Sequence, residues 1–133
     1  MERAVRDVIV ECTNASEEER ITFGEVVAKL HRAGVERYHA DLVRGEKTYY
    51  LPNGESDVVC GGRAGIGISS DFSARDVEAA IKAIQSGRVQ YQAFCKSIAE
   101  AGCVGYIVSL TGRRAVYYGR TGENHVEWFP PVE

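Results

Sequence analysis

The chain has 133 residues, 44% of them hydrophobic, and a formal net charge of −3 at pH 7. A net negative charge argues against non-specific binding to nucleic acid, which needs a dominant basic field. The sequence has no apolar run of membrane-spanning length and no apolar signal core at its start, so we expect no membrane partner. Its four cysteines lack metal-site spacing and indicate free thiols in a reducing cytoplasm.

Two helices and three strands are expected in the first half of the chain. Apolar residues at helical spacing predict a helix at 2–15, and the polar residues 14–20 indicate a connector. Thr22 and Glu25 form the signature of a capping box for a second helix, which Gly34 ends. Alternation of apolar and polar residues and turn signals then predict strands at 35–43, 47–51 and 56–60.

The same order of elements is expected in the second half. A glycine-rich connector, 61–67, leads to a helix that Ser73 and Asp76 cap and that Gly87 ends. The remaining expected elements are a helix at 89–101 and strands at 104–110, 114–118 and 124–129, with Pro130-Pro131 stopping the last strand.

The two halves are also similar in sequence. Nine of the 37 positions from Thr22 to Val58 are identical to the residue 68 places later, whereas average residue usage gives roughly two or three. This pattern predicts an α+β fold in a single domain, 1–133. The domain would consist of two helix-helix-strand-strand-strand repeats, 1–66 and 67–133, with a mainly antiparallel sheet covered by helices. Positions at which the halves differ are expected to carry the function.

Two pairs of ionisable residues depart from the repeat. His39 and Asp41 share one face of an expected strand, and His125 and Glu127 share one face of another. Two imidazoles and two carboxylates presented to one cleft could bind a divalent metal or share a proton. The alternative is a solvated sheet face, on which alternating polar residues are ordinary.

Aromatic and basic residues on the expected hairpins are candidate contacts for a ligand or partner. In each tyrosine pair of the repeat, one ring must face the core and the other the opposite side. We expect Tyr49, Tyr118 and Arg120 to act as contacts, together with the pair His125 and Glu127. The Arg120 guanidinium suits a carboxylate or phosphate, or else a structural ion pair with an acidic neighbour such as Glu123.

Several motifs of the chain occur together in one known family. In the second half they are Gln85-Ser-Gly87-x-x-Gln90-Tyr91-x-x-Phe94, Ala101-Gly102-Cys103-x-x-Tyr106, Val116-Tyr117-Tyr118-Gly119-Arg120-x-Gly122 and His125-Val126-Glu127-x-Phe129-Pro130, and in the first half Ala33-Gly34 followed by Tyr38-x-x-Asp41. With these motifs the chain resembles a small bacterial family of domains of unknown function, some members of which are catalogued as phage envelope proteins. The resemblance covers nearly the whole chain and implies an α+β single domain without a settled activity.

The sequence contains no nucleophile elbow, zinc-protease motif or phosphate-binding loop, so an enzyme is not the first expectation. The leading hypothesis is a small cytosolic, non-enzymatic binding or interaction domain without a cofactor, which binds a protein partner or itself. One alternative is a metal-binding protein or acid–base enzyme that uses the histidines and carboxylates named above. Another is a phage-associated structural protein.

Overall fold

The computed structural model describes residues 1–61 and 65–129 and has the predicted α+β fold. Residues 62–64 of the glycine-rich connector and the expected stop at Pro130-Pro131 lie outside the described residues. The first-half elements are α1 (Arg3–Glu17), α2 (Phe23–Ala33), β1 (Arg37–Asp41), β2 (Glu46–Tyr50) and β3 (Ser56–Cys60). The second-half elements are α3 (Ala74–Gln85), α4 (Tyr91–Glu100), β4 (Cys103–Ser109), β5 (Arg114–Gly119) and β6 (Asn124–Trp128).

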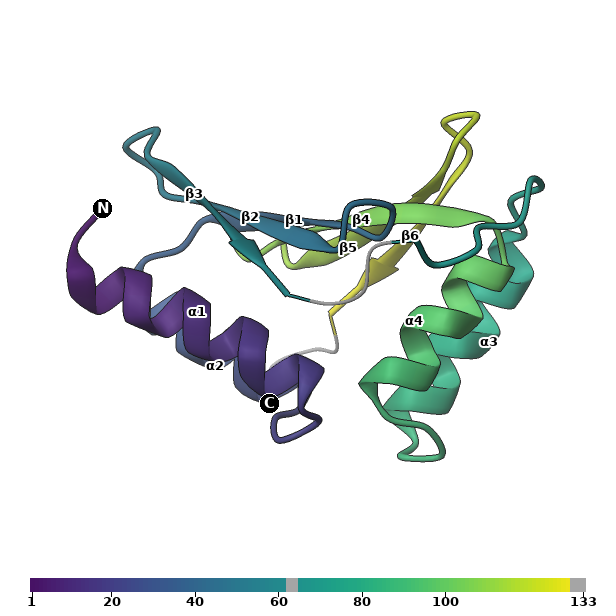
Figure 1. Ribbon diagram of the computed structural model, residues 1–133, viewed down its shortest axis with the longest axis horizontal. Helices are drawn as coiled ribbons and strands as arrows, with labels where there is room; N and C mark the ends of the chain where they lie inside the picture. Colours follow the sequence, from purple (N-terminus) through teal and green to yellow (C-terminus); the bar gives the residue numbers. More distant parts are fainter. Residues whose placement is uncertain (62–64, 130–133) are drawn as a thin grey trace.

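The six described strands form one antiparallel sheet in the order β3-β2-β1-β4-β5-β6. The two halves therefore meet where β1 pairs with β4, and His39 lies opposite Ile107 at the centre of that pairing. These two residues are also equivalent positions of the sequence repeat. The four helices of the described chain all lie on one side of the sheet, α1 with α2 and α3 with α4 (Figure 1). The opposite side carries no helix (Figure 1).

Strand alternation places a cluster of four tyrosines between the sheet and the helices. Tyr38 packs against Tyr49 and Tyr106 against Tyr117, each pair with ring centroids 5.2 Å apart. Tyr38 also meets Tyr106 across the β1–β4 joint, edge to face at 6.5 Å. All four rings are buried, and burial of large aromatic side chains is a dominant source of stability. This cluster forms the centre of the hydrophobic core.

The ends of α2 and α3 were predicted correctly from the sequence, whereas the end of α1 was predicted too early in the chain. The Thr22–Glu25 capping box is present, and Gly34 has the left-handed conformation expected after a helix. The helix α1, however, runs on to Glu17 through residues expected to form a connector. The hydroxyls of Thr13 and Ser16 donate to carbonyls one turn earlier, so these polar residues are accommodated within the helix.

No helix in the described part of the chain is both long enough and apolar enough to cross a membrane.

Gly34 and Gly102 are matched glycines in different surroundings, and this difference can be measured. Both have positive φ, +86° and +87°, but an added Cβ meets nothing at Gly34 and the Asp71 carbonyl oxygen at 2.2 Å at Gly102. We expect Gly34→Ala to cost about 1–2 kcal/mol of unfolding free energy, from backbone strain alone. Gly102→Ala should cost more than about 4 kcal/mol, because backbone must also move. Urea denaturation would measure both, and equal losses would contradict the account.

Candidate functional site

The predicted four-residue metal cluster is wrong, because its members lie on opposite faces of the sheet. Tyr38 and Ala40 face the core, so His39 and Asp41, which alternate with them, lie on the open face. His125 pairs with the inward residue Tyr117 and therefore lies on the helix-covered face, as does Glu127. Sequence alternation fixes which residues share a face within one strand. It does not fix how distant strands are aligned with each other.

The first pair has contacts of its own on the open face. His39 Nε2 lies 2.6 Å from the hydroxyl oxygen of Tyr118, and the two rings are stacked with centroids 5.9 Å apart. Glycine at 105 permits this packing, since a Cβ there would come within 2.8 Å of the same hydroxyl. Asp41 has a local role: its Oδ1 accepts hydrogen bonds from the backbone N–H groups of Val43 and Arg44 in the β1–β2 turn.

The second pair is completed by a residue that the sequence analysis did not single out. Glu78 on α3 brings its Oε2 to 2.7 Å from His125 Nε2, while Glu127 Oε1 lies 3.2 Å from the same nitrogen. One ligand atom from each of the three residues lies within 4.8 Å of the others. All three side chains are half-buried, and α3 packs directly on β6. This group, the Glu78–His125–Glu127 cluster, has the donor atoms of a divalent-cation site.

The two carboxyls of the cluster influence each other's ionisation. A hydrogen bond with Glu127 is the main cause that lowers the pKa of Glu78, and contact with His125 lowers it further. Desolvation, followed by the hydrogen bond with Glu78, raises the pKa of Glu127. Glu127 is therefore the more readily protonated of the two carboxyls, and Glu78 the more readily ionised. A cation between them would be attracted by both carboxylates.

The structure separates the predicted contacts into buried and accessible ones. Tyr49 is only 1% exposed and its hydroxyl lies 2.8 Å from Thr13 Oγ1, so the prediction of a surface contact is wrong there. The outward ring of that pair is Tyr50, whereas Tyr118 does point away from the core. Arg120 donates to the backbone carbonyl of Ile68 at 3.2 Å, which holds the β5–β6 hairpin against the segment before α3.

The open face carries a row of mostly apolar side chains that the sequence analysis missed. Strand registers align one residue from each strand across the sheet, and we call this set the central row. In spatial order it consists of Val58, Thr48, His39, Ile107, Val116 and Val126. Ile107 and Val126 are each 38% exposed. The row could have been predicted from Val58 and Val126. These two residues are identical aliphatic residues, 68 positions apart, at outward positions of their strands.

The sequence analysis also missed Lys47, a buried lysine on the helix-covered face. Its position inside β2 alternates with the core residue Tyr49. Its repeat counterpart is Ala115, which is buried in β5. The difference between the two halves at this position, lysine in one and alanine in the other, could therefore have been noticed in the sequence.

The cluster makes stability depend on pH in a defined way. Because the pKa of Glu127 is raised on folding, the stabilisation from its protonated form is present at low pH and is lost as pH rises through that pKa. Glu127→Gln keeps a neutral hydrogen-bonding group, so we expect it to stabilise the protein at neutral pH, by less than about 1 kcal/mol at this half-exposed site. The gain should vanish in acid. Thermal unfolding in a chelator would test this, and a gain that grows as pH falls would contradict it.

Comparisons with known proteins place the chain in a family but give it no activity. No curated protein matches the sequence. The sequence model of the family described as "Protein of unknown function (DUF1398)" matches residues 11–126, which is most of the chain and includes His39, Lys47, Glu78 and His125. The chain therefore belongs to this family of unknown function.

Proposed function

We propose that the chain is a non-enzymatic interaction domain whose open sheet face binds a second copy of itself. The observation that carries this proposal is the central row. Antiparallel sheets with one solvated face normally have polar side chains on that face. Here, four of the six residues of the row are aliphatic and three of these are more than a third exposed. Ile107, Val116 and Val126 are neighbours in the row, and an exposed apolar patch of this kind is typical of an interface.

The rows on either side of the central row favour a twofold pairing. One neighbouring row contains Arg37 and Arg114, and the other contains Asp41 and Glu46. A twofold axis that runs along the central row stacks this row on itself and sets the basic row of each copy over the acidic row of the other. An axis along the strands would instead set like charges together, so the charge pattern selects one of the two arrangements.

The contacts that charged and aromatic side chains make within one chain do not prevent this pairing of two copies. Arg37 is ion-paired with Glu36, and Arg44 with Glu46, but these pairs are exposed. Exposed ion pairs contribute little, so exchanging them for contacts with a second copy costs little. The flanking aromatic rings are already ordered: the guanidinium carbon of Arg114 lies 3.8 Å from the centroid of Trp128. Pre-ordered side chains lose less entropy on binding.

The proposal predicts that a charge in the central row prevents self-association. Ile107→Asp should convert a dimer to a monomer, because burying an unpaired carboxylate against a second apolar row is costly. Light scattering coupled to size-exclusion chromatography would measure the mass. Val43→Asp provides a matched control, since Val43 is an exposed aliphatic residue outside the row and should leave the dimer intact. A wild-type protein that stays monomeric at high concentration would contradict the proposal.

The Glu78–His125–Glu127 cluster supports a second candidate function, the binding of a divalent cation. Two carboxylates and one imidazole form a mixed donor set that suits Zn²⁺ or Mn²⁺, with water completing the coordination. In addition, the buried Oε2 of Glu78 lies 2.7 Å from His125 Nε2 without the geometry of a hydrogen bond, so a cation could be coordinated by both atoms. A cation bound there would link α3 to β6 and neutralise the repulsion between the carboxylates.

Cation binding is tested by removing one histidine at a time. Calorimetric titration with Zn²⁺ and with Mn²⁺ should show binding that His125→Ala abolishes, because this variant loses the central ligand. His39→Ala, on the opposite face, should bind as the wild type does. Absence of binding by the wild-type protein, or equal losses in both variants, would contradict the assignment.

Other expectations from the sequence remain proposals. We propose one domain across 1–133 that arose by duplication, and a cytoplasmic location. A phage-associated structural role fits the same open face, because structural assembly proteins bind copies of themselves. Dimerisation through the central row is the property that such a role would require.

A further inference from the structure

Lys47 is a buried lysine for which the described residues provide no ion-pair partner. It lies on β2 among the inward-facing residues and is only 5% exposed. Its nitrogen lies 4.7 Å from the centroid of the Tyr91 ring and 5.9 Å from that of Tyr38. Within the described residues it takes part in no hydrogen bond or ion pair. Isolated buried ammonium groups are costly, so such a residue calls for an explanation.

The surroundings of Lys47 favour its neutral amine. Desolvation is the main cause that lowers its pKa. The groups whose charge acts on it from the packed helices are Cys12, Glu17 and Cys95. Burial raises the pKa of Cys95 to about 11 and also raises that of Cys12, so both thiols are uncharged at neutral pH. Glu17 is then the single anionic group among them, and it forms no ion pair with the lysine.

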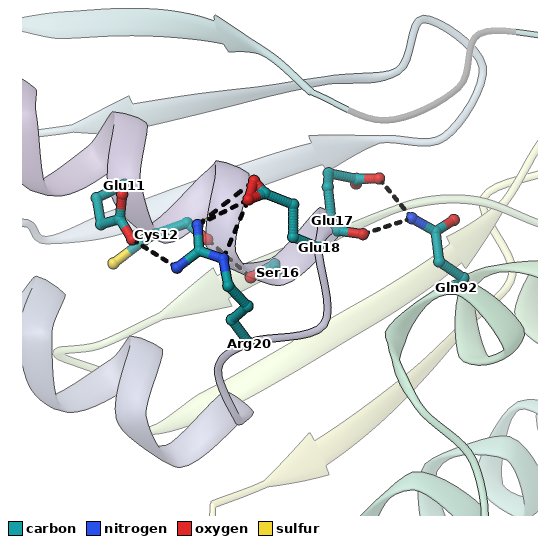
Figure 2. A network of polar contacts seen from close by, with 7 residues as sticks. All are labelled: Glu11, Cys12, Ser16, Glu17, Glu18, Arg20 and Gln92. Atoms are coloured by element: carbon teal, nitrogen blue, oxygen red, sulfur yellow. Dashed lines mark hydrogen bonds and ion pairs between the residues drawn. The ribbon is translucent and has the colours of Figure 1, made fainter.

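Lys47 lines a small pocket between the end of α1 and the start of α4. The residues that contribute to its wall include Lys47, Glu17, Tyr91, Gln92 and Cys95. Figure 2 shows how one side is fixed: the Gln92 side-chain amide donates to the Glu17 carbonyl oxygen at 2.8 Å and to its carboxylate at 3.0 Å. A hydrogen bond between side chain and backbone thus ties the two helices together beside the lysine.

The charge of the pocket selects the class of ligand. Glu17 contributes a carboxylate to its wall on the helix-covered side, so a free anion is disfavoured there. A neutral lysine amine in an aromatic, desolvated environment is a nucleophile toward carbonyl carbon. We infer that Lys47 is a reactive amine that forms a Schiff base with a small uncharged aldehyde or ketone.

The reaction is balanced by loss of one water molecule. The lone pair of Nζ attacks the carbonyl carbon, and one Nζ proton passes to the carbonyl oxygen to give a carbinolamine. The hydroxyl takes a proton from solvent and leaves as water, the remaining Nζ proton passes to solvent or to a carboxylate such as Glu17, and a carbon–nitrogen double bond remains. No oxidant or reductant is required, so the step is reversible, and an added hydride donor would trap the product.

Reductive trapping tests the inference on the folded protein. Acetaldehyde with cyanoborohydride at neutral pH should ethylate Lys47 several-fold faster than the other lysines, because a lowered pKa raises the fraction of its amine that is neutral. The comparison lysines are Lys29, Lys82 and Lys96, all exposed. Peptide mass mapping over time would give the four rates.

Two controls keep the outcome decisive. In denaturant the preference for Lys47 should disappear, because it depends on the folded pocket. Tyr91→Phe should retain it, since the aromatic ring remains and only the hydroxyl is lost. Labelling of Lys47 no faster than that of the exposed lysines, or none at all in the folded state, would overturn the inference and leave Lys47 as a structural residue.

Discussion

The pairing of β1 with β4 is the contact on which the rest of the molecule depends. It is the joint through which the first three strands and the last three become one sheet, and it brings Tyr38 against Tyr106 beneath that joint. Each of these rings also packs on a second tyrosine of its own half. Backbone pairing and aromatic burial therefore act at the same place, and neither half encloses this core without the other.

This construction gives the two faces of the sheet different properties. Helices cover one face, so charged groups there are partly or wholly desolvated, as at Lys47 and in the Glu78–His125–Glu127 cluster. The uncovered face can instead offer a broad, shallow surface to a large partner. Chemistry with a small ligand is therefore expected beneath the helices, and association with a macromolecule on the open side. Lys47 and the Glu78–His125–Glu127 cluster lie at positions where the two halves of the chain differ, whereas the central row includes the identical pair Val58 and Val126.

Much of the fold follows from local sequence signals. The Thr22–Glu25 box, the left-handed glycine at 34 and the alternation in β1 each depend on residues close together in the chain, and the structure confirms them. The candidate sites were less predictable. That His39 and His125 lie on opposite faces depends on the pairing of distant strands, and the approach of Glu78 depends on how α3 packs.

Tyr49 and Lys47 show that even within a single strand the sequence did not determine which residues face the core. Alternation requires that one residue of Tyr49-Tyr50 point inward, but it does not say which one. Once Tyr49 is placed inward, Lys47 must follow it, two residues away on the same face. Comparison with Ala115 could have resolved the choice, because the matching position of β5 carries a small apolar residue on the same face as the buried Tyr117.

The centre of the β1–β4 joint has a consequence for how such a chain could have arisen. His39 and Ile107, which face each other there, are equivalent residues of the two halves. If the chain arose by duplication, as we propose, its half-length ancestor would have presented β1 as a bare edge able to pair with the β1 of an identical molecule, with residue 39 opposite its own copy. Joining two such molecules in one polypeptide would preserve this register. It would also release each half from the need to remain identical, so that a lysine could persist in one while alanine filled the matching place in the other.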